Sequence, residues 1–360
     1  MPTEAIDTPA LVVDLEAYER NLDRMAASLR GHPVRLRPHA KTHKCPVVAR
    51  HQMGRGAVGV CCQKVSEAEA MVYGGVPNVL VTNQIVGPSK IARLLSLAKQ
   101  ADVAVCVDDP ENVRQLDEAA RAFGVRLPVL VEVNIGMNRC GVEPGEPVAD
   151  LARRVAATTG LEFRGLQAYH GRAQHIQDAD KRREVMDEAL ARVRRTVECL
   201  GESGLACEVV TGAGTGTYQF ESASGLYTEL QPGSYIFMDV DYKRVAGFPS
   251  RFENALFVLA TVMSRPVKDR AVVDAGLKAL AVDSGLPAVH GRADMEFVRA
   301  SDEHGMLVPR DPETRLRVGD RLWLIPGHCD PTINLYDWYV CVRAGRVDAL
   351  WPITARGAVL

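Results

Sequence analysis

The sequence has no long apolar run, no excess of charge of either sign and no cysteine pattern of a disulfide-rich protein. Its apolar runs are of strand length, too short to cross a bilayer, so we expect no membrane-spanning segment. The 43 lysines and arginines nearly balance 45 aspartates and glutamates, and no basic face is evident. This balance argues against nucleic-acid binding.

Features of a secreted or repetitive protein are missing as well. The first residues lack the basic start and apolar core of a signal peptide. Nine scattered cysteines, several inside apolar runs, predict buried thiols in a reducing compartment rather than disulfides, so we expect a cytoplasmic protein. There is no repeat of fixed period, and 360 residues suit a barrel with a smaller second domain.

Strands and helices alternate through the first two thirds of the chain. A strand at 8–14 and a helix at 15–29 come first. Eight further strands are predicted at 34–41, 57–62, 78–83, 102–108, 127–134, 162–169, 207–212 and 229–238, with helical patterns between most of them. The repeated order implies right-handed crossovers and a parallel sheet, and eight units are the count of a closed (β/α)8 TIM barrel. A doubly wound sheet would show a glycine-rich turn after its first strand, where residues 39–43 read HAKTH.

The pattern changes after about residue 247. Strand-like segments follow without long helices between them, at 255–262, 270–275, 295–299, 316–324 and 338–343. We therefore expect an α/β chain with a TIM barrel at 16–246 and a C-terminal all-β domain at 247–360. The isolated strand within residues 1–15 is expected to join the β domain.

The stretch 34–44 (VRLRPHAKTHK) begins as a strand and ends with two lysines and two histidines. A lysine at the C-terminal end of a parallel barrel strand lies where such barrels do chemistry. Its amine, partly desolvated, can form a Schiff base with an aldehyde cofactor. A basic surface loop is the structural alternative for these residues taken alone.

Small residues follow the seventh strand and continue in the eighth. Residues 211–217 read TGAGTGT, and residues 232–235 read PGSY. Glycines let backbone N–H groups close around a phosphate, and threonine hydroxyls add donors. Loops after strands seven and eight are where barrels commonly bind phosphate, although a tight turn is the structural alternative.

Residues 167–175 (QAYHGRAQH) place a phenol, two imidazoles and a guanidinium after the sixth strand. His175 is a candidate general base near neutral pH. A helix cap or packed polar residues would explain most of these side chains individually, so we do not expect His170 and His175 both to act.

Residues 326–332 (PGHCDPT) hold a histidine and an aspartate two positions apart. On an extended segment His328 and Asp330 would point the same way, with Cys329 facing away. One imidazole and one carboxylate suit a hard or borderline divalent ion with water or substrate in the open positions. The flanking prolines favour a fixed turn over a regular strand.

These motifs together resemble the D-threonine aldolase and D-serine dehydratase family, which has the fold of alanine racemase (PLP fold type III). The likeness lies in residues 37–44 (RPHAKTHK), the Gly-Thr-Gly loop and residues 326–335 (PGHCDPTINL). Residues 136–141 (GMNRCG) are similar to the alanine-racemase motif that places an arginine beside the cofactor's phenolic oxygen. The 3-hydroxy-D-aspartate aldolase branch is resembled at 58–70, 273–278 and 301–305.

The resemblance implies how pyridoxal 5'-phosphate (PLP) would be held. Lys41, rather than Lys44, would form the Schiff base. Arg139 would lie near the ring oxygen, and Tyr169 near the ring or the substrate. The residues implied for the phosphate are Gly214, Thr215, Gly233, Ser234 and Tyr235.

The resemblance also implies a base and a metal. His175 matches the histidine proposed as base in the aldolases, and His328 and Asp330 would bind a divalent ion, with Asp302 as a partner for metal-bound water. The family's dehydratases tend to carry His-x-Cys, suited to zinc. His-x-Asp favours harder ions, so Mn2+ or Mg2+ is expected, with Co2+ or Zn2+ as alternatives.

The implied activity is retro-aldol cleavage of D-3-hydroxy-amino acids, such as D-threonine or D-3-hydroxyaspartate, to glycine and an aldehyde. The main alternative is β-elimination of D-serine or D-threo-3-hydroxyaspartate to a keto acid and ammonia. A racemase would have no use for the metal pair, and the small non-catalytic PLP proteins of this superfamily lack a β domain. A homodimer is a further expectation from the resemblance. A distal substrate carboxylate would be met by Arg37, Arg172 or Gln63.

Overall fold

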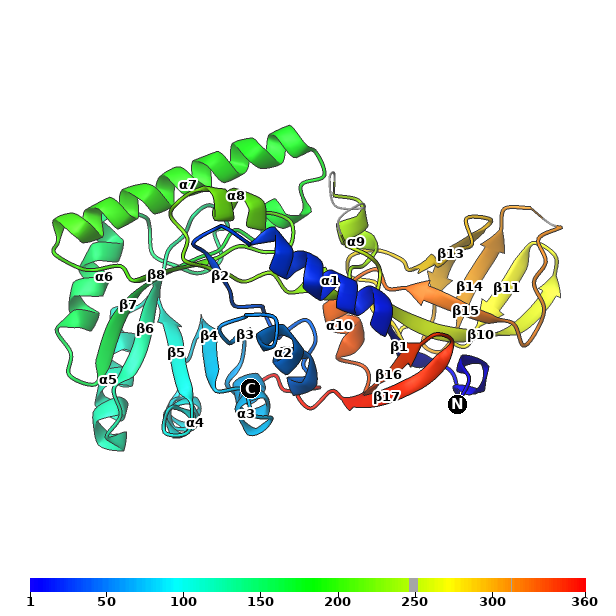
Figure 1. Cartoon of the computed structure of the whole chain (residues 1–360), viewed down its shortest axis with the longest axis horizontal. Helices are drawn as coiled ribbons and strands as arrows, with labels where there is room; N and C mark the ends of the chain where they lie inside the picture. Colours follow the sequence, from blue (N-terminus) through cyan, green and yellow to red (C-terminus); the bar gives the residue numbers. More distant parts are fainter. Residues whose placement is uncertain (246–251, 312) are drawn as a thin grey trace. The chain divides into compact units, whose positions relative to one another are not determined.

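The computed structural model describes residues 1–245, 252–311 and 313–360, which form two compact units (Figure 1). The barrel unit comprises Ala26–Lys41, Cys45–Gly233 and Gly357–Leu360. The β unit comprises Met1–Met25, Thr42–Lys44 and Ser234–Arg356. The domain boundary expected at 246/247 lies outside the described residues and stays a prediction.

An eight-stranded parallel sheet forms the barrel unit. Its strands, in spatial order, are β2 (Arg35–Leu36), β9 (Glu229–Leu230), β8 (Val209–Gly212), β7 (Leu161–Ala168), β6 (Leu127–Glu132), β5 (Asp102–Val107), β4 (Asn78–Gln84) and β3 (Val60–Cys62). A parallel bridge between His39 and Cys61, with a 2.9 Å bond from the Cys61 N–H to the Pro38 carbonyl, joins the segments after β2 and within β3. The sheet therefore closes, and the predicted fold class is confirmed.

Helices cover the outside of the barrel strands, as in other barrels of this kind (Figure 1). They are α2 (Pro46–Met53), α3 (Val65–Tyr73), α4 (Pro88–Ala98), α5 (Pro110–Phe123), α6 (Glu146–Ala156), α7 (Ala179–Glu202) and α8 (Tyr218–Ala223). The sequence sets their ends, as α5 illustrates. Asp109 caps α5 by accepting bonds from two backbone N–H groups, proline is its first residue, and Gly124 ends it at φ 66°.

The β unit is built on a nine-stranded sheet. Its strands are β1 (Ala10–Asp14), β10 (Leu256–Val267), β11 (Arg270–Val273), β12 (Ala288–Val289), β13 (Met295–Ala300), β14 (Gly305–Pro309), β15 (Arg321–Ile325), β16 (Trp338–Arg343) and β17 (Arg346–Pro352). The N-terminal strand β1 runs antiparallel to β10 and parallel to β16. Its central residues Val12 and Val13 are fully buried there. The helices here are η1 (Thr3–Ala5), α1 (Leu15–Ser28), η3 (Ser234–Ile236), α9 (Val240–Lys243) and α10 (Cys329–Ile333).

Some predicted strands differ from the observed ones. The eighth barrel strand, expected at 229–238, is only the two residues of β9, followed by the 3-10 turn η3. Pro232 has no N–H to continue the ladder, which explains the early end. The segment expected at 316–324 is extended only in β15, and β12, β14 and β17 were not predicted.

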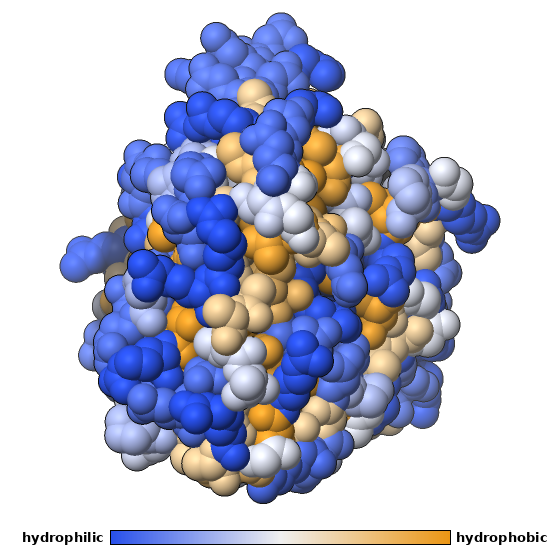
Figure 2. Space-filling view, turned by 90° about the vertical axis from the view of Figure 1, so that its left-hand side faces the viewer, coloured by the Kyte–Doolittle hydropathy of each residue, from blue (hydrophilic) through white to orange (hydrophobic). Residues whose placement is uncertain are grey.

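The surface fits a chain whose helices turn polar faces outward. Seen from the side where α5, α6 and α7 lie in Figure 1, hydrophilic side chains cover most of the face and apolar ones show between them (Figure 2). None of the helices in the described ranges is long and apolar enough to cross a membrane.

Candidate active site

Lys41 follows the C-terminal end of β2, in a segment that the neighbouring strands hold in place. The Lys41 N–H donates to Nδ1 of His39 at 3.3 Å. The other ring nitrogen, Nε2, therefore carries the proton and lies 3.0 Å from Thr82 Oγ1 and 3.2 Å from Gln63 Oε1. The Lys41 side chain is half-buried at the end of this fixed segment. It thus lies at the end of the barrel where such folds do chemistry.

Lys44, the less favoured Schiff-base residue, is engaged in the β unit. Its backbone adopts φ 52°, and its Nζ lies 3.4 Å from the carbonyl oxygen of Ala355. The Ala355 N–H in turn donates to the Lys44 carbonyl at 3.1 Å. These contacts give Lys44 a structural role and favour Lys41 for chemistry.

Arg139 and Tyr169 come together beyond the ends of β6 and β7. The Arg139 guanidinium carbon lies 5.8 Å from the centroid of the Tyr169 ring, within cation–π range. The loop that carries Arg139 is shaped by Asn134, whose Oδ1 accepts bonds from the N–H groups of Gly136 and Asn138. Two of the predicted site residues are thus neighbours at the same end of the barrel as Lys41.

Glu132, the last residue of β6, was not singled out from the sequence because it ends an apolar strand. It is buried, and Gln84 donates to its Oε2 at 2.6 Å. Burial raises the pKa of Glu132, and the bond from Gln84 and the charge of Arg139 only partly oppose this. A carboxylate at the C-terminal end of a barrel strand was the signal that could have identified it.

The two histidines after β7 occupy different environments. His170 is buried, and its Nδ1 accepts the Ala173 N–H at 3.4 Å, closing the turn η2 (Arg172–His175). Burial also lowers the pKa of His170. His175 ends the turn with an exposed side chain. The arrangement favours His175 as the group that meets a substrate.

The Gly-Thr loop (residues 211–217) follows β8 and leads directly into α8. The Tyr218 N–H bonds the Gly214 carbonyl at 3.0 Å, and Thr215 is only 1% exposed. The Gly216 N–H donates to Oε1 of Gln174 at 2.9 Å. Gln174 was not singled out from the sequence, although it lies within the motif at 167–175.

The second small-residue segment divides at the edge of the two units. Gly233 is the last residue of the main barrel segment. Ser234 begins η3, and its carbonyl accepts bonds from the N–H groups of Phe237 and Met238 at 3.1 and 2.8 Å. Tyr235 is fully buried, with its ring 5.7 Å from that of Phe252. The Tyr235 ring therefore packs in the core of the β unit.

His328 and Asp330 do not share an extended segment, so that prediction was wrong. His328 is extended at φ -145° and precedes α10, whose first turn contains Asp330. Pro331 is tolerated there because the first N–H groups of a helix have no partner within it. Cys329 points away as expected, with its Sγ 3.4 Å from the Met238 carbonyl. Asp239 fixes the start of α10 by accepting the Cys329 N–H at 3.0 Å.

The side chains of Asp283 and Ser284 both contact Nδ1 of His328, and the Asp283 carboxylate is the nearer. Oδ2 of Asp283 lies 2.7 Å from this nitrogen. Burial alone would lower the pKa of His328, but the charges of Asp330, Asp283 and Asp239 outweigh it and raise the pKa. Asp302, expected as the outer partner, is exposed between β13 and β14.

The metal site predicted from the sequence has two protein ligands, His328 and Asp330. Across residues 1–245, 252–311 and 313–360, no group of three or more His, Cys, Asp or Glu side chains is arranged to hold a metal ion. His328 and Asp330 would then supply two ligands, and water or substrate the others.

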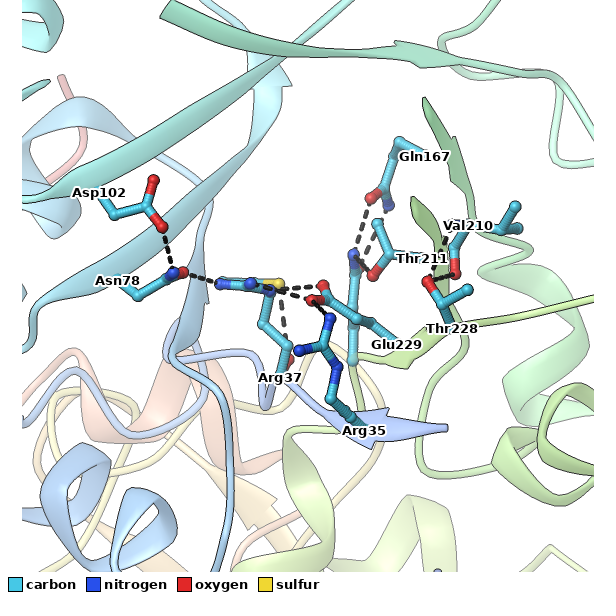
Figure 3. Close-up of polar contacts among 11 residues, drawn as sticks. Arg35, Arg37, Asn78, Asp102, Gln167, Val210, Thr211, Thr228 and Glu229 are labelled. Carbon is cyan, nitrogen blue, oxygen red and sulfur yellow. Dashed lines mark hydrogen bonds and ion pairs between the residues drawn. The ribbon is translucent and has the colours of Figure 1, made fainter. Parts of the chain in front are cut away.

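A cavity of about 460 Å3 lies at the opposite, N-terminal ends of the barrel strands. Polar side chains that line the cavity include Arg37 and Glu229, which form an ion pair with the Arg37 Nε 2.6 Å from Oε2 of Glu229. Arg37 also donates to the side chain of Asn78 (Figure 3). Arg37 therefore points away from the end that carries Lys41. The expectation that it meets a substrate carboxylate there was wrong, because its strand position faces the other mouth.

Two family models match the chain. The alanine racemase N-terminal domain matches residues 13–241, and the serine dehydratase domain matches residues 255–342. These matches define the class of protein: an alanine racemase-type barrel followed by a β domain of the serine dehydratase type.

Individual relatives narrow the class. The 3-hydroxy-D-aspartate aldolase of Paracoccus denitrificans (strain Pd 1222) is 49% identical over 365 residues, which cover 99% of this chain and 94% of that protein. The crystal structure of D-threonine aldolase from Filomicrobium marinum is 50% identical, with a TM-score of 0.98, covering 100% of this chain and 98% of that one. The D-threo-3-hydroxyaspartate dehydratase of Delftia sp. (strain HT23) is 28% identical over 369 residues, covering 96% of this chain and 97% of that protein. The chain belongs to the D-threonine aldolase and 3-hydroxy-D-aspartate aldolase family, so the resemblance seen in its motifs is confirmed.

Proposed function

We propose that this protein is a PLP- and divalent-metal-dependent aldolase that cleaves D-3-hydroxy-amino acids to glycine and an aldehyde. D-Threonine and D-3-hydroxyaspartate are the substrates to which the names of its relatives point. One observation carries the proposal: Lys41, Arg139, Tyr169 and the Gly-Thr loop all follow the C-terminal ends of strands in one closed barrel. That end is where barrel enzymes place their reacting groups.

The residues present fit PLP. Lys41 supplies a half-buried amine for the aldehyde, and the Arg139 and Tyr169 pair supplies a cation and a ring for the cofactor's aromatic face and oxygen. The Gly-Thr loop supplies N–H and hydroxyl donors for the phosphate, together with Gly233 and Ser234. When bound, PLP would supply an electron sink for the bond broken at Cα.

The donor set at α10 fits a hard divalent ion. An imidazole and a carboxylate without a thiolate favour Mn2+ or Mg2+, and Cys329 is turned into the protein. Such an ion would lower the pKa of the substrate's β-hydroxyl. Asp283 would hold the histidine ring from the side away from the ion.

The chain's own groups would then complete the reaction. Cleavage between Cα and Cβ requires the β-hydroxyl to lose its proton as the aldehyde forms. His175, exposed at the end of η2, would take that proton as general base. Tyr169 and Arg139 would orient the reacting molecule above the barrel.

Two features disfavour the rival reaction, β-elimination: the predicted metal ligands His328 and Asp330, and the sequence identity to the named relatives. The Delftia dehydratase is 28% identical to this chain, whereas the two aldolases named above are 49% and 50% identical. The aspartate of His-x-Asp is also a harder ligand than the cysteine found in the family's dehydratases.

Product analysis tests the proposal. Purified protein with PLP and Mn2+ is given D-threonine or D-threo-3-hydroxyaspartate, with and without EDTA. We expect glycine in equal amount to the aldehyde, and none after EDTA. Ammonia and a keto acid without glycine would mean that the dehydratase reaction is correct.

The Lys41→Ala variant tests the cofactor assignment. It should lose both the visible absorbance of bound PLP and turnover, because the variant removes the amine that we assign to the aldehyde. Lys44→Ala is the control and should keep the absorbance, since Lys44 bonds a backbone carbonyl. Intact absorbance in Lys41→Ala would refute the assignment.

We also infer a cytoplasmic homodimer. None of the nine cysteines, all in the described ranges, forms a disulfide, which suits a reducing compartment. Trp338 and Leu350 are 53% and 59% exposed on the paired strands β16 and β17, an apolar surface that a second subunit would cover. Light scattering of the purified protein at several concentrations measures the oligomeric state.

A further inference from the structure

We propose that Gln174 is a positioning residue that ties the Gly-Thr loop to the turn carrying His175, so that a phosphate group in the loop and the placement of His175 are coupled. The inference rests on the proposed function, because it takes the loop as the phosphate site and His175 as the base. It adds a residue that touches neither substrate nor cofactor in its own right.

Gln174 is a fully buried amide whose hydrogen bonds reach both segments. Its Nε2 donates to Thr217 Oγ1 at 2.8 Å and to the His170 carbonyl at 3.2 Å. Its Oε1 accepts the Gly216 N–H at 2.9 Å. Both donors of the side chain and one lone pair are thus engaged, two bonds to the loop and one to the η2 segment.

The orientation of the Gln174 amide is fixed by the hydrogen bond between Thr217 and Glu221. Thr217 Oγ1 donates to Oε1 of the buried Glu221 at 2.8 Å. Because the threonine proton is used there, Thr217 can only accept from Gln174, which directs Nε2 toward it and Oε1 toward Gly216. A residue that cannot both donate and accept at these two points does not fit the site.

The two loop glycines are required by the same side chain. A Cβ added at Gly214 would clash with Oε1 of Gln174, and one added at Gly216 would clash with the Gln174 carbonyl oxygen. The loop therefore packs directly on Gln174, and its backbone has no room to move toward the turn. Because the Gly216 N–H donates to Gln174, the phosphate must be held by the other donors of the loop.

The position of the His175 backbone is tied to that of Gln174, the residue before it in the turn. His175 itself is exposed, whereas Gln174 directly before it is buried and anchored. The backbone N–H of Gln174 also bonds the Gly171 carbonyl at 3.2 Å within η2. Any displacement of the Gly-Thr loop on phosphate binding is therefore transmitted through the Gln174 side-chain amide to the backbone that carries His175.

Two pairs of variants test the inference on the full-length protein. Gln174→Leu keeps the volume and removes the bonds, and Gln52→Leu is the control, a second fully buried glutamine that lies on α2. Thr217→Val removes the hydroxyl and its bonds to Gln174 and Glu221 at constant shape, and Thr217→Ser retains the hydroxyl. Thermal unfolding of each variant shows which of them fold as the wild type does.

The first measurement is affinity. PLP is titrated into protein freed of cofactor, with inorganic phosphate as a competitor. We expect Gln174→Leu and Thr217→Val to bind PLP and phosphate at least tenfold more weakly, and Gln52→Leu and Thr217→Ser to stay within about threefold of the wild type. Equal losses in Gln174→Leu and Gln52→Leu would overturn the proposal, because the loss would then follow from any buried glutamine.

The second measurement is the coupling itself. The imidazole of His175, assigned through a His175→Asn spectrum, is followed by NMR as inorganic phosphate is added. Its signal should shift in the wild type and in Thr217→Ser, and stay unmoved at saturating phosphate in Gln174→Leu. A shift that persists in a folded Gln174→Leu protein would overturn the coupling.

These readouts separate the inference from the proposed reaction. A wild type that binds PLP competitively with phosphate but forms no glycine would refute the aldolase and still allow both measurements. A wild type that binds neither PLP nor phosphate would overturn both, since the loop would not be a phosphate site.

Discussion

His328 meets its neighbours through one ring nitrogen. Nδ1 is held by Asp283 at 2.7 Å, with Oγ of Ser284 at 3.3 Å. This leaves Nε2 as the nitrogen for a metal ion. In metal sites the second nitrogen of a histidine is usually held by a carboxylate, which fixes the ring and makes it a stronger ligand.

Removing that carboxylate should weaken metal binding. Asp283→Asn is expected to lower the Mn2+ affinity by about 10–100-fold, the usual effect of losing such a partner. Free Mn2+ measured by EPR during titration gives the affinity without turnover. Asp187→Asn, an exposed position on α7, is the control and should bind Mn2+ as the wild type does. Equal affinity in Asp283→Asn would mean that the contact does not support the metal site.

Glu221 is a buried carboxyl group whose pKa the fold raises. It is fully buried, accepts a bond from Thr217, and burial raises its pKa to about 7 from 4.5. In the unfolded chain the group ionises near pH 4.5. Its contribution to stability is therefore fully present below pH 4.5 and is lost as the pH rises toward 7.

Glu221→Gln should remove this pH dependence. This pKa shift corresponds to a fall of about 3 kcal/mol in the free energy of unfolding between pH 4.5 and pH 8. The free energy of unfolding by urea, measured at pH 5 and pH 8, should fall less with pH in Glu221→Gln than in the wild type. Glu188→Gln, on α7, is the control and should leave the slope as it is. An unchanged slope in Glu221→Gln would show that Glu221 is ionised in the folded protein.

At the scale of elements, the barrel is closed by very short strands. β2 and β9 have two residues each, so few backbone bonds join them. A buried ion pair reinforces this seam: Arg37 contacts Glu229 on β9 through both Nε and Nη2, and it also bonds Asn78 on β4 (Figure 3). Burial alone would lower the pKa of Arg37, but its bonds to Glu229 outweigh it and raise the pKa.

Breaking this pair should destabilise the barrel. Arg37→Met is expected to lower the free energy of unfolding by about 3–5 kcal/mol, since it leaves the Glu229 carboxylate buried without its main partner. Arg114→Met, which breaks exposed pairs with Glu111 and Glu118 on α5, is the control and should cost far less. Urea unfolding of both variants measures the difference. Similar losses would mean that the seam does not depend on the ion pair.

For the whole molecule, the thiols report on the folding of both units. All nine cysteines lie in the part of the chain that the structure describes, and none of them forms a disulfide. Six of them are buried: Cys45, Cys61, Cys62, Cys106, Cys329 and Cys341. Burial also raises the pKa of several of these thiols, which keeps them protonated and unreactive.

A thiol-reactive disulfide reagent should therefore distinguish the native from the unfolded chain. At most the three half-buried thiols, Cys140, Cys199 and Cys207, should react in the native protein, and all nine should react in denaturant. The midpoint of thermal unfolding should be the same with and without a reducing agent, because no disulfide is present to lose. Rapid reaction of more than three thiols in the native protein would contradict the structure.

The sequence by itself determined the alternation of strands and helices in the barrel. Eight apolar segments separated by helical patterns were enough to predict the barrel, because the periods of strands and helices are local properties. Lys41 and the Gly-Thr loop could be found the same way, since each directly follows a strand. The early end of β9 was missed because apolar residues resume in η3, whereas Pro232, which lies between the two elements, ends the ladder.

Only the tertiary structure decided which side chains meet. Asp283 and His328 are 45 residues apart, Gln174 and Gly216 are 42 apart, and Arg37 and Glu229 are 192 apart. No local pattern encodes such contacts, because they depend on how whole strands and loops pack. The same holds for the direction of Arg37, which one strand position sends to the N-terminal mouth of the barrel. A sequence motif names the groups available for chemistry, and long-range packing determines their partners, their pKa values and the end of the barrel they face.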